Sequence, residues 1–367
     1  MNINFLEPVI AEEDIEAAVA VLRSGWITRG KISEQFEASL AAYLGSEHVV
    51  VNSSGTAALH VALMAADVGP GDEVITTPLS YVATSNAILY VGAKPVFVDV
   101  EPSTGLMDIS QVEKAITEKT KAVIPVHLYG QMVDMRALKT IADRHHLSII
   151  EDACHAIEAE RDGVRPGALS FAACFSFHAA KNLSCGEGGA VSVHDAAVAE
   201  QLRLYSDAGV KKGGGQRFMI TFGYKYSLTE FQAALLVNQL KRIESLWQAR
   251  RKVYLTYVQG LQDTGVMFPK EIPNSKNACH MFVFWVMKGE REALRRALSE
   301  KGIPTSIHYN PIHLEPYYRE RFGYMPGAFP ATEAIGQSII TLPLYPTMTS
   351  EKQDYIIAEL KSLLRAG

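Results

Sequence analysis

The chain has 367 residues, of which 48% are hydrophobic and 20% are charged, and its formal net charge is -5. This balance is that of an ordinary globular protein, and the length favours one large domain together with a smaller one. The negative charge provides no general attraction to nucleic acid or anionic lipid. No apolar run reaches the ~18 residues that a membrane span needs.

The start of the chain and the cysteines bear on the compartment. Residues 1–4 carry neither the basic nor the apolar segment of an export signal. The four cysteines show no C-x-x-C pairing, and three of them lie in apolar or glycine-rich stretches; they are Cys154, Cys174, Cys185 and Cys279. We therefore expect buried thiols rather than disulfides, no metal site and a cytoplasmic location.

Strand-like and helix-like segments alternate over about the first two hundred residues. Strands are expected at residues 48–52, 73–77, 95–100, 122–127 and 147–151, and helices at 57–66, 82–90, 111–117 and 135–146. Such alternation predicts a largely parallel sheet with helices on both faces. The apolar run 122–126 suits a strand that is buried on both sides.

The pattern changes in the second half of the chain. Short strands at 171–177 and 189–193 flank a polar, glycine-containing turn, and 196–206 is expected to be helical. Residues 211–216 predict a Gly/Lys loop, and Ser227 to Glu230 fits a capping box ahead of a helix at 231–243. A second α/β block begins near residue 251, with 281–287 as its clearest strand. The expected domains are therefore 1–250 and 251–367.

Lys181 is the first candidate for chemistry. It follows the apolar run 175–180, which we expect to end a strand, and it precedes a Gly-Glu-Gly-Gly turn at 186–189. Lysines are usually solvated, but this context favours a desolvated amine. Desolvation lowers the pKa of a lysine and leaves a free amine that can attack an aldehyde.

Asp152 is expected at the end of the buried strand 147–151. A pyridinium ring that acts as an electron sink needs a carboxylate to keep its nitrogen protonated, and Asp152 is placed for that role. Period-2 alternation points Glu151 to the other face. A helix cap is the other interpretation of Asp152. His155 is either a ring contact or a structural histidine.

Residues 51–58 form a third candidate, a strand followed by a turn of small residues and a helix start. Backbone N–H groups at such a turn, with the positive end of the helix dipole behind them, bind anions. The spacing is not that of a P-loop. If the bound anion is a phosphate, the Ser176 hydroxyl could contact it as well. Tyr81 could stack on an aromatic ring, although core packing is commoner for tyrosine.

These segments, in this order and at these separations, resemble the DegT/DnrJ/EryC1/StrS family of sugar aminotransferases. The resemblance covers nearly the whole chain and rests on residues 24–31, 151–155, 176–182, 186–189, 223–234, 307–318 and 342–346. It implies an α/β, fold-type I (aspartate aminotransferase-like) fold and the cofactor pyridoxal 5'-phosphate (PLP).

The resemblance also implies roles for single residues. Lys181 would hold PLP as a Schiff base and move protons, and Asp152 would partner the pyridinium nitrogen. The remaining cofactor contacts implied are His155 and Tyr81 at the ring and Gly55, Thr56 and Ser176 at the phosphate. In this family the loop around residue 225 crosses to the phosphate of a neighbouring subunit. Many members carry an arginine there, whereas this chain has Lys225 and Ser227, so Lys225 is the candidate contact in a homodimer with shared sites.

The segment 308–318 is most similar to enzymes that aminate C4 of 4-keto-6-deoxy-hexoses, such as those feeding pseudaminic acid or 4-amino-4-deoxy-arabinose. The implied partners are a nucleotide-linked keto sugar and, as amino donor, L-glutamate. The candidates for the substrate pocket are Trp26, Thr28, Gly30, His178, His308, Tyr309 and His313. A 3-keto sugar, a keto-cyclitol, or a non-catalytic regulator of the same fold are the alternatives. The presence of Lys181 argues against the regulator and against the family's dehydratases, which carry histidine there.

Overall fold

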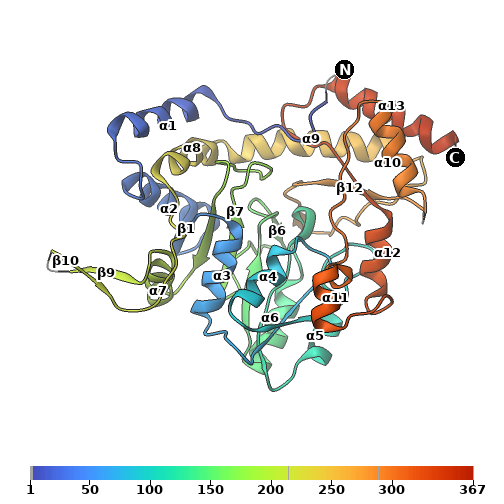
Figure 1. The fold of residues 1–367 in the computed structure, drawn as a ribbon. Coiled ribbons are helices and arrows are strands. Elements are labelled where there is room, and N and C mark those ends of the chain that lie inside the picture. Colours follow the sequence, from blue (N-terminus) through green and yellow to red (C-terminus); the bar gives the residue numbers. More distant parts are fainter. Residues whose placement is uncertain (1–2, 214, 288, 367) are drawn as a thin grey trace.

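The computed structural model describes residues 3–213, 215–287 and 289–366. Its centre is a seven-stranded sheet with the strand order β1-β8-β7-β5-β4-β2-β3 (Figure 1). The strands are β1 (His48–Asn52), β2 (Glu73–Thr76), β3 (Lys94–Phe97), β4 (Thr120–Val123), β5 (Ser148–Asp152), β7 (Ala172–Ser176) and β8 (Gly189–Val193). Strands β3, β2, β4, β5 and β7 run parallel, and β8 is antiparallel to both β7 and β1. The predicted, largely parallel sheet is confirmed.

Helices cover both faces of this sheet. One face carries α3 (Gly55–Ala65), α4 (Ala83–Tyr90) and α7 (Ala196–Ser206). The other carries α2 (Lys31–Leu44), α5 (Ile109–Ala115), α6 (Met135–His145) and α8 (Glu230–Lys241). Successive side chains of a strand point to opposite faces, so Cys174 of β7 packs with the α3 side and Phe175 packs with Phe36 of α2 on the other.

The C-terminal part has a smaller core of its own. Strand β12 (Phe282–Trp285) pairs antiparallel with β13 (Ile339–Leu342), and α10 (Arg291–Glu300) and α13 (Ser350–Ala366) pack against them. The long helix α9 (Ile243–Leu261) contributes Tyr257 to the same core. The remaining elements are α1 (Glu12–Ser24), η1 (Leu128–Gly130), β6 (Glu160–Arg161), β11 (Ser275–Lys276), η2 (Ile312–Leu314), α11 (Pro316–Phe322) and α12 (Pro330–Ser338).

The loop predicted at residues 211–216 is wrong in its main part. The chain forms a hairpin of β9 (Val210–Gly213) and β10 (Gln216–Met219), which projects from the body of the molecule in Figure 1. Gly215 lies at the reversal with a positive φ of 78°, a conformation that favours glycine, and Gly214 lies outside the described residues. Glycine content indicated a loop, but the glycines lie at the turn between paired strands.

The capping box predicted from Ser227 to Glu230 is also wrong. Helix α8 begins at Glu230 with Thr229 as N-cap, and the backbone N–H of Thr229 donates to Gln232 Oε1 at 3.3 Å. Glu230 instead accepts hydrogen bonds from the first turn of α2, at the backbone N–H groups of Ile32 and Ser33, both 2.8 Å away. The local pattern was correct for a cap, but the carboxylate caps a helix that lies two hundred residues earlier.

Within the described residues no helix is long and apolar enough to span a membrane. The same part of the chain holds no group of three or more His, Cys, Asp or Glu side chains arranged to bind a metal. All four cysteines are free thiols, as expected.

Candidate active site

The carboxyl ends of three strands bring the candidate residues together. Strands β1, β5 and β7 run in the same direction, so Gly55 after β1, Asp152 at the end of β5 and Ser176 at the end of β7 lie at one edge of the sheet. A cavity of about 470 Å³ opens there. It is lined by Ser54, Gly55, Thr56, Leu59, Ser80, Tyr81, Ala83, Thr84, Val126, Asp152, Cys154, His155, Ser176, His178, Ala180, Lys181, Glu187, Met281, His308 and Tyr309.

The N-terminus of α3 forms one wall of this cavity. Ser54 is its N-cap, and the Ser54 side chain accepts from the Ala57 N–H at 3.0 Å. Position 55 has room only for glycine, because an added Cβ would lie 2.9 Å from both Cys154 Sγ and Ser176 Cβ. The backbone N–H groups of the first turn therefore face the cavity closely, which suits a phosphate.

Asp152 is buried at the cavity floor. Its Oδ2 accepts from the Thr84 hydroxyl at 2.7 Å, and its Oδ1 accepts from the Cys154 N–H at 3.2 Å. Glu151 faces the opposite side, as the alternation predicted, and bonds to His127 at 2.6 Å and the Gly167 N–H at 2.8 Å. Thus one carboxylate of the pair is structural and the other is presented to the cavity.

Lys181 lies five residues beyond the end of β7, so the prediction that it ends a strand was wrong. The loop is built from tight turns, in which the Lys181 N–H donates to the His178 carbonyl at 2.8 Å and the Ala179 N–H donates to the Gly186 carbonyl at 2.9 Å. Burial lowers the pKa of the Lys181 amine, while Cys154 and Asp152 act in the opposite direction. The loop thus produces the desolvated amine that the sequence predicted.

Three rings form the side of the cavity opposite α3. His155 and Tyr309 are stacked with centroids 6.2 Å apart and planes at 19°, and the Tyr309 hydroxyl lies 3.3 Å from His155 Nε2. Tyr81 lies 6.0 Å from the Tyr309 ring, and its side chain is 59% exposed. An exposed aromatic ring at a cavity mouth can pack on a planar ligand.

The histidines around Lys181 are held neutral. Burial lowers the pKa of His308 to about 4, with a further contribution from Lys181, and His308 Nδ1 lies 2.9 Å from the Thr341 hydroxyl. Burial likewise holds the pKa of His155 well below its usual value. His178 is different, since its ring is half exposed at the mouth and lies 3.8 Å from Glu187.

Two predicted site residues lie away from this cavity in the single chain. His313 is fully buried, and its Nε2 bonds to Glu333 at 2.9 Å. Lys225 is 70% exposed and forms an ion pair with Asp207 of the same chain.

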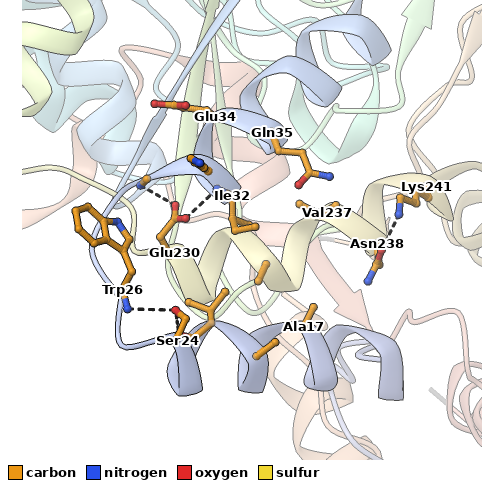
Figure 2. A pocket seen from close by; sticks show the side chains of 15 residues that line it. Ala17, Ser24, Trp26, Ile32, Glu34, Gln35, Glu230, Val237, Asn238 and Lys241 are labelled. Atoms are coloured by element: carbon orange, nitrogen blue, oxygen red, sulfur yellow. Dashed lines mark hydrogen bonds between the residues drawn. The ribbon is translucent and has the colours of Figure 1, made fainter.

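The predicted residues Trp26, Thr28 and Gly30 lie elsewhere as well. Trp26 and Gly30 line a second, larger cavity of about 840 Å³ between α1, α2 and α8, and Thr28 is exposed nearby. Figure 2 shows this cavity, with Glu230 between Trp26 and the first turn of α2. Its walls combine small apolar side chains, such as Ala17 and Val237, with polar ones, such as Gln35 and Asn238. We place the chemistry in the smaller cavity, because the lysine and the aspartate converge there.

Sequence reasoning missed three residues of the cavity as functional candidates. Thr84 orients Asp152, Cys154 lies close to Gly55 at the start of α3, and Met281 contributes apolar surface. Thr84 and Met281 lie outside the recognised motifs. Cys154 lies within the motif 151–155, but it was expected only to be a buried thiol.

The cavity fits PLP in its donor set. The helix N-terminus suits the phosphate, the buried carboxylate suits the ring nitrogen, and the desolvated amine suits the aldehyde. His155 Nδ1 is buried and has no hydrogen-bond partner within the described residues, which leaves it available to a ligand.

Comparisons with known proteins identify the family of the chain. The sequence profile of the DegT/DnrJ/EryC1/StrS aminotransferase family matches residues 8–361. SpsC, a spore coat polysaccharide biosynthesis protein of Bacillus subtilis, is 36% identical over 375 residues, which cover 98% of this chain and 96% of SpsC.

Two solved structures illustrate the likeness in fold. Spr1654 of Streptococcus pneumoniae in its PMP-form has a TM-score of 0.96 at 31% identity, covering 100% of this chain and 98% of that chain. It is also known in a PLP-form. Helicobacter pylori PseC, an aminotransferase involved in the biosynthesis of pseudoaminic acid, has a TM-score of 0.95 at 30% identity and is covered over 100% of both chains.

Proposed function

The chain belongs to the DegT/DnrJ/EryC1/StrS aminotransferase family and is a PLP-dependent sugar aminotransferase, and from this premise we propose its donor and acceptor. It moves an amino group from L-glutamate to the C4 keto carbon of a nucleotide-linked deoxy sugar. The product is a precursor of a cell-surface polysaccharide or glycan, made in the cytoplasm.

The convergence of Lys181, Asp152 and the α3 N-terminus in one cavity carries the proposal. When bound, PLP would supply the carrier of the amino group and, in its ring, the electron sink for both halves of the reaction. The ε-amine of Lys181 holds and returns the proton in each half of the reaction, because its lowered pKa leaves part of it uncharged. Asp152 presents its carboxyl group at the floor of the cavity, where the Thr84 hydroxyl orients it.

The identity of the acceptor is proposed from polar residues that line the cavity and from the two relatives. His308, Tyr309 and His178 line it beyond the ring positions and offer polar atoms to a sugar. The likeness to PseC over the full chain supports a 4-keto sugar, and the likeness to SpsC supports a role in polysaccharide synthesis. His313 bonds within the protein and is proposed to support the pocket rather than to touch substrate.

We propose that the active unit is a homodimer with shared sites. The hairpin β9–β10 projects from the body of the molecule, and Lys225 follows it in the sequence with a side chain that is 70% exposed. A contact to a partner's phosphate would start in this region. A dianionic phosphate in a partly dry site needs a cation beyond the helix dipole, and Lys225 supplies one.

A substrate panel tests the proposal. Purified protein with PLP and L-glutamate is given nucleotide-linked 4-keto-6-deoxy sugars, 3-keto sugars and a keto-cyclitol, and 2-oxoglutarate and the amino product are measured. We expect turnover with a 4-keto sugar. Turnover confined to the 3-keto sugar or the cyclitol would contradict the C4 assignment, and a glutamine-only donor would contradict the choice of glutamate.

A further inference from the structure

A small second cavity lies on the other side of Lys181 from the candidate active site. It measures about 30 Å³ and is bounded by residues 6–9, the loop 179–184, α9, His280 and residues 344–346. Lys181 lines both this cavity and the active-site cavity. We call it the rear cavity.

Three residues of the rear cavity each have a buried polar atom without a hydrogen-bond partner among the described residues. These atoms are Arg250 Nη1, His280 Nε2 and the Tyr345 hydroxyl. Arg250 and His280 are each 6% exposed and Tyr345 is 2% exposed. Buried polar atoms are nearly always paired, because an unpaired one costs about 1–3 kcal/mol. Three such atoms around one cavity therefore indicate a ligand.

The hydrogen bonds behind His280 decide what its free nitrogen can do. Asn182 Nδ2 donates to both oxygens of Glu158, at 3.0 and 2.8 Å, and to the Ala278 carbonyl at 3.0 Å. These partners are all acceptors, so the Asn182 oxygen must face His280 Nδ1, which lies 3.1 Å away and donates its N–H.

His280 Nε2 is therefore a bare acceptor. Burial, with His155 and Lys181 nearby, holds the pKa of His280 well below its usual value, so the ring does not take a second proton. Arg250 Nη1 lies 3.7 Å from Glu158 Oε1, so the two residues form an ion pair, but this distance is too long for a hydrogen bond and leaves the Nη1 N–H groups without an acceptor.

The rear cavity thus offers two donors, Arg250 Nη1 and the Tyr345 hydroxyl, and one acceptor, His280 Nε2. An anion cannot donate to His280, and a metal cation cannot accept a hydrogen bond from Arg250 Nη1 or the Tyr345 hydroxyl. A water molecule can accept from the first two and donate to the third. The volume of about 30 Å³ exceeds the ~10–15 Å³ that a cavity needs to hold one water.

We propose that the rear cavity is a binding site for one ordered water, held by Arg250, His280 and Tyr345. The water completes the hydrogen bonding of His280, whose ring packs 4.4 Å from the ring of His155. His155 lines the active-site cavity. His280 is therefore a positioning residue that acts on the active site through His155.

A double-mutant cycle in the full-length protein tests the site. His280 and Tyr345 have no hydrogen bond to each other in the described structure. The effects of replacing them on the stability of the protein should therefore be coupled only through a shared water. We expect His280→Asn and Tyr345→Phe each to lower the thermal unfolding midpoint, and the double variant to lower it by less than the sum. An additive result would overturn the proposal.

Tyr257→Phe is the matched control. Its hydroxyl is also buried but has protein partners, the Pro343 carbonyl at 3.1 Å and Met348 Sδ at 3.2 Å. Its effect should add to that of His280→Asn. If Tyr257→Phe and His280→Asn were coupled as strongly as Tyr345→Phe and His280→Asn, the coupling would come from the core in general. That result would overturn the proposal of a shared water.

A crystal structure of the unaltered protein gives a second test that does not depend on any variant folding. We expect one peak of density within about 2.6–3.2 Å of all three atoms. A cavity without density, or density for a larger solute, would overturn the proposal. For the positioning role, His280→Asn should weaken PLP binding several-fold, whereas Tyr345→Phe should change it less. Unchanged PLP affinity in His280→Asn would overturn the positioning role of His280, whereas the water site is judged by the density and by the double-mutant cycle.

Discussion

Lys181 owes its reactivity to a loop rather than to a strand. The turns at residues 178–186 hold the amine beside Asp152 and Cys154, in a place where burial lowers the pKa of the amine. Free amine at neutral pH is what attack on an aldehyde needs. We therefore propose that Lys181 is the lysine that binds PLP, and we expect that no other lysine of the chain competes for it.

Borohydride tests this at the residue scale. It reduces the bond between a lysine and PLP, and peptide mapping should place the label on Lys181. Lys181→Ala should reduce turnover on the order of 10³-fold or more, because the group that moves the proton is gone. A label on Lys225, or on any other lysine, would refute the assignment.

Asp152 should matter for turnover more than for cofactor retention. Asp152→Asn keeps an oxygen for the Thr84 hydroxyl, now 2.7 Å from Oδ2, but removes the negative charge. We expect PLP to stay bound while turnover falls at least ~10-fold, because the ring is a weaker electron sink. Absorbance of bound PLP and steady-state rates measure the two effects. Turnover close to that of the unaltered protein would exclude the role.

His308 should make the stability depend on pH. Its pKa is about 4 in the folded protein, below the ordinary value of 6.5 for histidine, so the unfolded chain binds a proton that the folded chain does not. Stability should therefore fall as the pH is lowered from about 6.5 to about 4, by at most ~1.4 kcal/mol per pH unit from this group. Urea unfolding at pH 7 and pH 5 measures the slope.

The matched variants for this test are His308→Asn and His194→Asn. The first should flatten the slope, because the titrating ring is lost. His194 is exposed, so its replacement should leave the slope as it is. Equal slopes in His308→Asn and the unaltered protein would contradict the prediction.

At the scale of elements, Glu230 joins α8 to α2. Its carboxylate accepts from the N–H groups of Gly30, Ile32 and Ser33, each at 2.8 Å, and from the Ser33 hydroxyl at 2.6 Å. Burial raises the pKa of this carboxyl, but these hydrogen bonds outweigh it and leave the pKa below its usual value. The carboxylate also sits at the positive end of the α2 dipole. The segment that leads into α2 is thus fixed by a residue of α8.

Glu230→Gln should destabilise the protein by about 1.5–3 kcal/mol at pH 7, since hydrogen bonds to a charged group are lost. The loss should shrink as the pH falls through the lowered pKa, because the carboxylate then protonates in the unaltered protein as well. Glu34→Gln, an exposed change in the same first turn of α2, is the control and should cost little. Equal effects of the two changes would mean that Glu230 does not act as the cap of α2.

At the scale of the whole molecule, we retain the division into residues 1–250 and 251–367 as a proposal. The boundary falls inside α9, a continuous helix. The two halves of that helix pack in different cores, which supports the division. Ile243, at its start, packs with the core under the large sheet, and Tyr257, in its second half, packs with β12. A helix shared by two cores would transmit movement of one to the other.

Complementation tests the shared active site. If Lys225 reaches a partner's phosphate, Lys181→Ala and Lys225→Ala are each inactive, and mixing them should give heterodimers with one intact site and part of the activity. The number of subunits is checked by light scattering at assay concentration. A fully active Lys225→Ala protein would contradict the shared site, and so would an active monomer.

Local sequence patterns were enough to predict the order of strands and helices, and they also supplied the candidate residues for the chemistry. Alternation of apolar and helical segments is a local property, so β1, β8 and α7 were predicted with the boundaries that the structure has. Lys181, Asp152 and Gly55 were identified because each adjoins a recognisable strand end or turn, and the parallel sheet then places such ends at one edge.

Only the tertiary structure decided which side chains meet across long separations. Glu230 caps α2 and not its own helix, Thr84 orients Asp152, and Asn182 fixes the free nitrogen of His280. Trp26 and His313 were assigned to the substrate pocket, yet in the single chain they lie at another cavity and in the core. A hydrogen bond depends on distance in space, and no local pattern encodes which distant segment the fold brings within reach.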